Sequence, residues 1–459
     1  MIERLTAEDE VMLWPDQIWP QDIGALAVLD GNNLLDPDGR FRIEAVTEMV
    51  TGRLHLVPRF RQLLYLPPRR LGGPLWVDSP TFNVGDHIQV VPLASPGDEA
   101  QLLAAVEHVR RVRLDRSRPL WDMWFLPGLA EGRIGLFVRM HHSLADGMAG
   151  LAAISTFLDL TPDATPPTPQ PWTAAAAPTS AELFVDNLMQ HAHRLGRVLC
   201  TLAHPATSVQ RALAAWPALR ELLAQPTLRA TSLDRLVGPD RTLALVRGSL
   251  DLVKEAAHTF DASVNDVLLS ATAGGMSTLL GSRGEKADGG VVRTYVPVSL
   301  HQGSRAQARG NLIAQMVVPL PIEVMDPGRR LRQIAVETRL LKARTRPSLG
   351  ELPHRGFAGR AFLKLIDRQK VNVTSTNIPG PEAPLYLAGA KLLEVFPMVQ
   401  LIGTVSLAVG AMSYAGQFNI MVVADRDSCP DLGIFAVGLQ KELDVICTQR
   451  AGVHPPPAD

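Results

Sequence analysis

The sequence predicts an α/β protein made of two halves. Its 459 residues are enough for roughly two or three domains. Stretches with the pattern of strands alternate with stretches of helical periodicity along most of the chain. A composition break at residues 161–180 interrupts that alternation. We therefore expect one domain at 1–160, a proline-rich linker and helical crossing at 161–240, a second domain at 241–450 and a tail at 451–459.

The composition is that of an ordinary globular protein, with 46% hydrophobic and 20% charged residues, so a sizeable core is available. The 45 basic and 46 acidic side chains nearly balance, so nothing in the overall charge suggests a nucleic-acid partner. Three widely separated cysteines indicate a reducing compartment and no disulfide framework. The amino terminus lacks a hydrophobic signal region and the longest apolar stretches are too short to span a bilayer. We therefore expect a cytoplasmic protein that at most lies on a membrane surface.

In the first half, apolar runs bounded by turn residues predict strands, and apolar residues on one helical stripe predict helices. Strands are expected at 23–29, 88–93, 121–126 and 134–140, and helices at 44–56 and 98–112. The last two strands are separated by a short loop at 127–133, so they can pair as a hairpin.

The linker is marked by six prolines among the twenty residues 161–180 and by four consecutive alanines. Residues 181–233 then carry apolar side chains at helical spacing. A helix of this kind packs in a core or between domains, or it lies on a membrane surface, and the sequence leaves both interpretations open.

The second half resumes the alternation. Strands are expected at 242–250, 291–298, 312–320, 371–376, 403–413 and 417–423, and helices at 251–259, 267–280, 329–342 and 432–446. Ser263 is a candidate cap for the second of these helices, a loop should follow at 377–381, and the last two strands should form a hairpin about residues 414–416. Two α/β halves joined in this way place a ligand site at their interface.

One corner of the first half carries two adjacent histidines. The strand at 134–140 leads into His141 and His142, and helical spacing resumes near Asp146 and Gly147, which predicts a strand-turn-helix corner. Because side chains alternate along a strand, His142 falls on the face of the apolar even-numbered residues and His141 falls on the opposite face.

Three interpretations of the pair are open at this point. The histidines can be ordinary strand-end residues with satisfied hydrogen bonds. They can be metal ligands, although neither a His-Glu-x-x-His pattern nor a cysteine-rich partner is present, so no metal site is expected. One of them can be a general base, with Asp146 bracing the turn, because a neutral imidazole is the side chain best suited to take a proton near neutral pH.

Five arginines fall between Arg110 and Arg118. Such a run is typical of a solvated helix end. It would also suit a positive rim for a phosphate-bearing cosubstrate, or supply an arginine partner for a buried acid such as Asp146.

The segment His141-His142-x-x-x-Asp146-Gly147 resembles the active-site motif of the CoA-dependent acyltransferase superfamily, which includes chloramphenicol acetyltransferase-like enzymes and peptide-synthetase condensation domains. Further stretches, spanning roughly residues 50–430 in the same order, resemble the bacterial wax ester synthase/diacylglycerol acyltransferase family. These are Val57-Pro58-Arg59-Phe60-Arg61-Gln62, Leu114-Asp115-Arg116, Pro119-Leu120-Trp121, Asn265-Asp266, Val296-Pro297-Val298-Ser299, Gly310-Asn311 and Thr376-Asn377-Ile378-Pro379-Gly380-Pro381. Two departures are His301, where the family often has arginine, and the unusually acidic opening at 6–10; neither touches the candidate base.

The resemblance implies a two-domain, chloramphenicol acetyltransferase-like fold with a tunnel between the halves. It also implies an O-acyltransferase that moves a long-chain acyl group from acyl-CoA to a hydroxyl group. The acceptor would be diacylglycerol, in triacylglycerol synthesis, or a long-chain alcohol, in wax ester synthesis. Acyl-CoA is then a substrate and no cofactor is expected. Products this apolar suggest peripheral contact with a membrane or lipid droplet.

The resemblance also assigns roles when it is carried over residue by residue. His142 would be the general base, and Asp146 would turn away from it and form a structural pair with an arginine. Gly147 would permit the tight corner. His141 is left between simple packing and a supporting hydrogen bond.

Direct transfer is expected rather than a covalent acyl-enzyme, because no Gly-x-Ser-x-Gly elbow is present and no cysteine lies near the histidines in sequence. Candidate oxyanion donors or tunnel residues are Ser375, Thr376, Asn377 and Asn265. The alternatives are a lipid-binding protein of the same fold without turnover, another hydroxyl acceptor, and a carrier-bound thioester as the donor.

Overall fold

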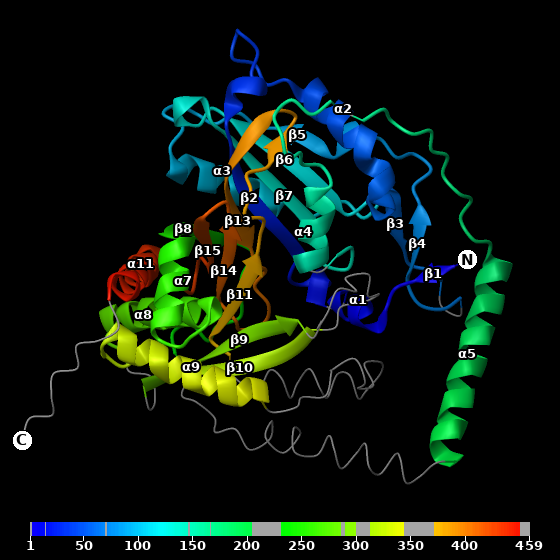
Figure 1. The fold of residues 1–459 in the computed structure, drawn as a ribbon. Coiled ribbons are helices and arrows are strands. Elements are labelled where there is room, and N and C mark those ends of the chain that lie inside the picture. The colour runs from blue at the N-terminus through cyan, green and yellow to red at the C-terminus, as the bar shows by residue number, and fades with distance from the viewer. Residues whose placement is uncertain are drawn as a thin grey trace, which may run out of the picture.

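The structure is a computed structural model that describes residues 2–13, 15–68, 71–145, 147–165, 167–203, 231–285, 290–299, 313–343 and 371–449. Within these ranges the chain forms two six-stranded sheets and one three-stranded sheet. Figure 1 shows the two large sheets next to each other, with helices packed on them. The predicted α/β class with two halves is confirmed.

The first large sheet is built around the strand that leads into the histidine pair. Its order is β12-β13-β2-β7-β6-β5. Its strands are β2 (Asp22–Leu29), β5 (Ile88–Val90), β6 (Trp121–Pro127), β7 (Ile134–His141), β12 (Tyr386–Leu387) and β13 (Ala390–Met398). β6 and β7 form the predicted antiparallel hairpin, and β2 runs antiparallel on the other side of β7.

Alternation along β7 separates two cores. Its even-numbered residues share one core with α2 (Ile43–Arg53) and α4 (Gly147–Ser155). Phe137, on the other face, shares a second core with α3 (Glu99–Arg111) and with strands of the second half of the chain. The α3 helix begins with a capping box in which Asp98 and Gln101 satisfy each other's backbone N–H groups.

Two strands of the first sheet come from the second half of the chain. β13 pairs antiparallel with β2, so that Pro397 faces Ala25, and β12 pairs with β13. The Tyr414 hydroxyl holds this segment in place, because it accepts a hydrogen bond from the Leu385 N–H at 2.8 Å and donates one to the Leu392 carbonyl at 3.0 Å. The sequence pattern did not predict these strands, and they join the two halves through backbone hydrogen bonds.

The second large sheet has the order β10-β9-β11-β14-β15-β8. Its strands are β8 (Arg241–Ser249), β9 (Val291–Ser299), β10 (Ile313–Pro321), β11 (Val373–Pro379), β14 (Leu407–Tyr414) and β15 (Gln417–Asp425). One face shares a core with the helices α7 (Leu250–Thr259), α8 (Val264–Ser282), α9 (Pro327–Ala343) and α11 (Leu432–Thr448). The other face contributes Met421 and Val423 to the core that contains Phe137.

The three-stranded sheet consists of β1 (Glu3–Arg4), β4 (Leu75–Asp78) and β3 (Gln62–Tyr65), and the short helix α1 (Ala7–Met12) follows β1. It holds one end of α5 (Ser180–Ala203), because Leu183 is buried against β4 and Arg4 Nε pairs with Asp186 Oδ2 at 2.6 Å. Beyond this attachment α5 projects from the sheets, beside the amino terminus (Figure 1). No helix in the described part of the chain is long and apolar enough to cross a membrane.

Most predicted elements are present within a few residues of their expected bounds. The hairpin turn between β14 and β15 has φ of 46° at Ala415 and 81° at Gly416, which matches the twist of the flanking strands. The predicted loop at 377–381 is wrong at its start, because β11 continues to Pro379. The helix predicted at 181–233 is described only to Ala203, and residues 231–233 are not helical. The predicted tail at 451–459 lies outside the described residues.

Candidate active site

The histidine corner has the predicted strand-turn-helix form. β7 ends at His141, His142 begins the turn, and α4 begins at Gly147. The His142 N–H donates to the Gln21 carbonyl at 2.8 Å, and the residue is only 9% exposed. The turn therefore holds His142 by its backbone just past the last strand position. Asp146 lies outside the described residues, and with it the arginine pair predicted for it.

The corner lies where core residues of both halves meet. Leu144 and Ala145, which follow the histidines, pack on the core of the first sheet. The same core contains Met412 from β14 and receives Ile378 from β11. The second half of the chain therefore reaches the turn that carries His142.

The His141 ring is fixed at both of its nitrogens. The Ser143 N–H donates to His141 Nδ1 at 3.1 Å, and the Ser143 hydroxyl lies 2.7 Å from the same nitrogen. His141 Nε2 lies 3.4 Å from Asp16 Oδ1. Because a backbone N–H can only donate, Nδ1 must be the acceptor, so the neutral ring carries its proton on Nε2. Nε2 is buried without a hydrogen bond within the described residues, and the Asp16 carboxylate is the acid beside it.

Asp16 is itself closely surrounded. Its Oδ1 accepts the Gln21 N–H at 2.9 Å, and Arg116 Nη2 pairs with Oδ2. Burial raises the pKa of Asp16, but the neighbouring His141 and the hydrogen bonds from the Gln21 N–H and Arg116 hold that pKa well below its ordinary value. The carboxylate is therefore ionised beside His141 across the neutral range.

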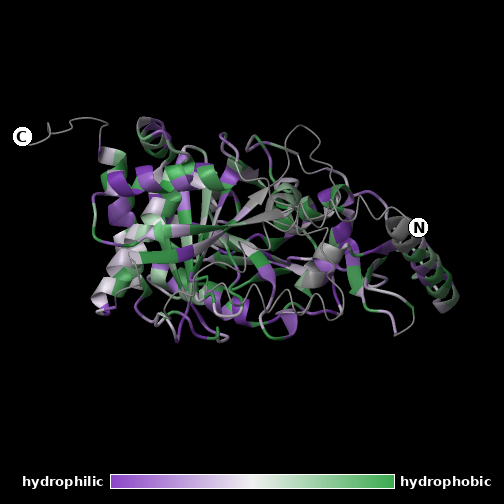
Figure 2. Cartoon of the chain, turned by 90° about the horizontal axis from the view of Figure 1, so that it is seen from below, coloured by the Kyte–Doolittle hydropathy of each residue, from purple (hydrophilic) through white to green (hydrophobic). Residues whose placement is uncertain are grey.

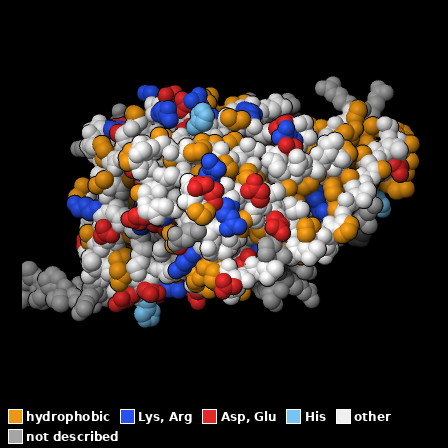
Figure 3. Space-filling view, turned by 90° about the horizontal axis from the view of Figure 1, so that it is seen from above, with side chains coloured by type: hydrophobic (Ala, Val, Ile, Leu, Met, Phe, Trp, Pro, Cys, Tyr) orange, Lys and Arg blue, Asp and Glu red, His pale blue; other side chains and the backbone are white. Residues whose placement is uncertain are grey.

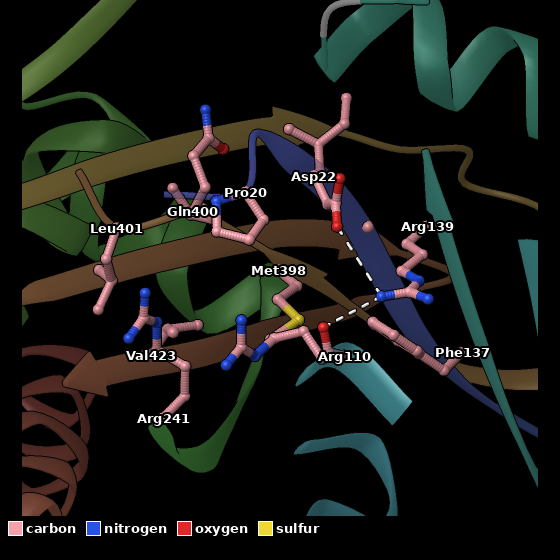
Figure 4. Close-up of a pocket in the computed structure, with 13 residues that line it drawn as sticks. Pro20, Asp22, Arg110, Phe137, Arg139, Arg241, Met398, Gln400, Leu401 and Val423 are labelled. Carbon is pink, nitrogen blue, oxygen red and sulfur yellow. Dashed lines mark hydrogen bonds and ion pairs between the residues drawn. The ribbon is translucent and has the colours of Figure 1, made fainter. Parts of the chain in front are cut away.

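Asp22 faces His141 across the β2–β7 pair and is in the opposite electrostatic situation. Burial raises the pKa of Asp22 from 3.8 to about 6, although the charges of Arg139 and His141 lower it. Its ion pair with Arg139 is long, at 3.8 Å, because that guanidinium binds Asp122 with both Nε and Nη2. Figure 4 shows Arg139 placed between Asp22 and the backbone of Arg110.

Two cavities border this region. One, of about 200 Å³, lies on the His141 side of the corner, and its lining includes Asp16, Asp22, Arg113 and Leu120. The other, of about 20 Å³, lies at the contact between the two large sheets and is shown in Figure 4. Asp22 lines both, so it is the acidic group that connects them.

The arginine run at 110–118 is braced by acids and carbonyls. Arg110 Nε pairs with Glu107 at 2.7 Å, and Arg113 Nη1 donates to the Asp16 carbonyl at 2.6 Å. The others pair with Asp240 (Arg111), Asp16 (Arg116), and Asp86 and Asp115 (Arg118). These contacts favour a bracing role for the run over a bare positive rim.

The candidate oxyanion residues fall into two groups. Ser375, Thr376 and Asn377 lie on β11. Ser375 and Asn377 pair with Val409 and Ala411, whose side chains belong to the helix-covered core of the second sheet. Because side chains alternate along a strand, Thr376 is on the other face, with Ile378, which packs on the core of the histidine corner. Ser375 is fully buried, and neither its Oγ nor Asn377 Oδ1 has a hydrogen-bond partner among the described residues.

Asn265 belongs to a different part of the fold. It lies in the first turn of α8, one of the helices that cover the second sheet, and α8 packs on β11. Its neighbour Asp266 forms a capping box with Ser263 and accepts from Thr338 Oγ1 at 2.7 Å. The Asn265-Asp266 motif therefore starts a buried helix.

The sequence pattern missed Asp16, Gln21 and Asp22. Asp16 and Gln21 are buried at the corner and Asp22 is partly buried there, but they lie about 120 residues before the histidines, and no spacing rule connects them. An isolated aspartate before a strand carries no local signal that marks it as part of a site.

Two large sheets, the first completed by strands from the second half of the chain, and a histidine corner where the halves meet are the arrangement expected for the class of HHxxxDG acyltransferases. Comparison with family models makes the assignment specific. The wax ester synthase/diacylglycerol acyltransferase catalytic domain matches residues 5–268, and the C-terminal domain of the same enzymes matches residues 309–447. The chain belongs to the wax ester synthase/diacylglycerol acyltransferase family and is an acyltransferase, which confirms the resemblance.

Individual relatives agree with this assignment. The chain is 29% identical over 428 residues to "Probable diacyglycerol O-acyltransferase tgs1" of Mycobacterium tuberculosis, covering 91% of this chain and 89% of that protein. Its fold matches the wax ester synthase/diacylglycerol acyltransferase from Marinobacter aquaeolei VT8, with a TM-score of 0.68 and 22% identity over 96% and 98% of the two chains. It also matches the starter condensation domain of rhizomide synthetase in complex with C8-CoA and Leu-SNAC, with a TM-score of 0.62 and 14% identity over 98% and 95%. At these identities the two solved structures establish the fold.

Proposed function

We propose that this acyltransferase moves a long-chain acyl group from acyl-CoA to the hydroxyl of diacylglycerol or of a long-chain alcohol, with His142 as the general base. The family assignment and the names of the relatives support the reaction class. The observation that carries the residue assignment is the place of His142 in the fold. It begins the turn after β7, with its backbone N–H on the Gln21 carbonyl, where core residues of both halves meet. His141 is the last residue of β7, and its Nδ1 accepts the Ser143 N–H.

In the proposed reaction, His142 removes the proton from the acceptor hydroxyl as its oxygen attacks the thioester carbonyl. The tetrahedral oxyanion then needs hydrogen-bond donors, and the proposed source is the β11 segment Ser375-Thr376-Asn377, where Thr376 is on the same face as Ile378. When the C–S bond breaks, the imidazolium returns its proton to the CoA thiolate. The ester and free CoA leave, and the enzyme is back in its starting protonation state.

Direct transfer accords with the cysteines that the structure describes. Burial raises the pKa of the Cys429 thiol to about 12 and that of Cys447 to about 11. A protonated, buried thiol is a poor nucleophile, so neither is suited to carry an acyl group. Release of CoA in a burst without any acceptor, together with a trapped acyl-protein, would contradict direct transfer.

The test of the base is the His142→Ala variant. We expect transfer to fall by at least about 100-fold while the protein remains folded, because a positioned base supplies about 10²–10⁴-fold of rate. The matched control is His108→Ala, an exposed histidine on α3, which should keep full activity. Wild-type turnover by His142→Ala would refute the assignment.

The acceptor is decided by a competition assay. Purified protein receives one long-chain acyl-CoA together with equal amounts of fatty alcohol, diacylglycerol and monoacylglycerol, and mass spectrometry identifies the esters. Triacylglycerol or wax ester supports the proposal and ranks the acceptors. Binding of acyl-CoA with no ester from any acceptor would instead indicate a lipid-binding protein without turnover.

We further propose that α5 brings the enzyme to the lipid surface that holds its apolar acceptor. The residues exposed on the side away from its attachment are Phe184 (54%), Val185 (47%), Leu188 (60%), Met189 (59%) and Leu195 (60%). Figure 2 shows hydrophobic and hydrophilic residues along α5, and hydrophobic side chains gather at that end of the molecule in Figure 3. An exposed apolar face of this size is typical of helices that lie in a membrane interface.

Flotation with phosphatidylcholine vesicles tests this surface. Leu188→Glu should lower the fraction of protein that floats several-fold, because the substitution places a charge at the centre of the apolar face. Val324→Glu is the matched control, since Val324 is 99% exposed but lies in the second half of the chain. Equal flotation of the Leu188 variant and wild type would exclude α5 as the contact.

A further inference from the structure

We propose that Asp16 is the positioning residue of the histidine corner: its carboxylate fixes the tautomer of His141 and the backbone of His142 at the same time. The proposal rests on the proposed function, in which His142 is the base. It assigns a role to a residue that precedes the HHxxxDG motif by more than 120 positions. The role depends on two routes from one carboxylate, one through a side chain and one through the backbone.

The first route runs through the His141 ring. The Ser143 N–H and hydroxyl both contact Nδ1, so the ring can accept there only when its proton is on Nε2. Nε2 has no hydrogen-bond partner within the described residues, and the nearest acid is the Asp16 carboxylate, whose Oδ1 lies 3.4 Å away and favours a proton on that nitrogen by its charge. Without the carboxylate, the tautomer with the proton on Nδ1 becomes competitive, and it would repel the Ser143 N–H. The turn that begins at His142 would then lose the contact that shapes it.

The second route runs through the backbone. The same Asp16 oxygen accepts the Gln21 N–H at 2.9 Å, and the Gln21 carbonyl accepts the His142 N–H at 2.8 Å. Gln21 is fully buried, so water cannot replace either bond without a rearrangement. The position of the His142 main chain therefore depends on where the Asp16 carboxylate lies.

Asp16 is suited to this task because it is itself immobilised. It is 6% exposed, Arg116 pairs with its second oxygen, and Arg113 donates to its carbonyl at 2.6 Å and to that of Gln17 at 3.1 Å. Two arginines of the run at 110–118 thus hold Asp16 in place, one at its carboxylate and one at its main-chain carbonyl. A catalytic group that is displaced by about 1 Å can lose about 100-fold in rate, so such anchoring has a direct kinetic value.

Kinetics of Asp16→Ala and Asp16→Asn test the proposal. Asp16→Ala should lower kcat by about 10–100-fold and change KM for acyl-CoA little, because the loss concerns placement of the base and not substrate binding. Asp16→Asn keeps an oxygen that can accept from Gln21 and His141, so it should recover most of kcat. Asp159 is the ion-pair partner of a buried arginine elsewhere in the same half of the chain. Asp159→Ala should therefore lower stability and leave kcat unchanged.

A double-mutant cycle shows whether Asp16 acts through His141. In the double variant, the fold-reduction in kcat should be smaller than the product of the fold-reductions in Asp16→Ala and His141→Ala, because both substitutions break the same contact. Losses that multiply, or a wild-type kcat in Asp16→Ala, would overturn the proposal.

A second measurement does not depend on turnover. In protein labelled with ¹⁵N-histidine, the His141 signal is the one that disappears in His141→Ala. In the wild type, that signal should be the signal of the Nε2–H tautomer. A signal of the Nδ1–H tautomer would overturn the positioning role even if the enzyme is fully active. Conversely, absence of transfer by the wild type would refute the proposed function, and the tautomer would still decide the role of Asp16.

Discussion

Asp22 should make the protein less stable as the pH rises through the weakly acidic range. Burial raises its pKa from 3.8 in the unfolded chain to about 6 in the folded one, so the folded state holds the proton more tightly. The favourable contribution is complete below about pH 4 and is lost as the pH rises through about 6. A change of this size corresponds to about 3 kcal/mol of unfolding free energy at neutral pH, since each tenfold change in acidity is worth about 1.4 kcal/mol.

The Asp22→Asn substitution removes this titration while keeping the size of the side chain. An amide resembles the protonated acid, and Arg139 retains its two bonds to Asp122. The stability of the variant relative to wild type should therefore rise by about 2 kcal/mol between about pH 4.5 and about pH 7.5. Urea unfolding followed by tryptophan fluorescence measures this at each pH.

Asp38→Asn is the matched control, because Asp38 is exposed in the same half of the chain. Its stability relative to wild type should be the same at both pH values. If the difference between Asp22→Asn and wild type were also independent of pH, the raised pKa of Asp22 would be refuted. A difference that fell with rising pH would mean that Arg139, and not burial, dominates the site.

Two further substitutions test buried polar contacts within the second half of the chain. Tyr414→Phe should lower the free energy of unfolding by about 1–3 kcal/mol, because the Leu385 N–H and the Leu392 carbonyl lose their buried partner. Urea midpoints at constant slope measure this change. An unchanged midpoint would show that water replaces the hydroxyl. Arg330→Met should lower the free energy of unfolding by about 3–5 kcal/mol at neutral pH, because the substitution leaves the buried Glu442 carboxylate without its guanidinium partner. This loss should shrink as acid protonates Glu442. A loss that does not depend on pH would indicate a packing effect instead.

The sequence predicted the local elements well because each carries its own periodicity. The pairing of β6 with β7, the start of α8 at Ser263 and the turn at Ala415 and Gly416 all depend on residues that lie close together in the chain. The same holds for the histidine corner, where strand, turn and helix are consecutive.

What could not be predicted is what the fold brings together from afar. β13 has no marked alternation, because it is buried among strands of both halves, and its partner β2 lies more than 350 residues earlier. The contacts of Asp16 with His141 and Gln21 likewise depend on a loop whose sequence gives no signal. Resemblance singled out the histidine motif, whereas the side chains that contact it from distant parts of the chain emerge only from the three-dimensional structure.

The strands that the second half contributes to the first sheet have a consequence for biosynthesis. Until residues 386–398 have left the ribosome, the edge of β2 that later pairs with β13 carries unsatisfied backbone groups. The nascent first half therefore waits through most of translation with an open, apolar edge, which favours association with other chains. Residues 1–160 expressed alone should accumulate as aggregates, and a synthetic peptide of residues 384–400 added during refolding should keep more of that fragment soluble. In this enzyme, the end of the chain completes the sheet that its beginning starts.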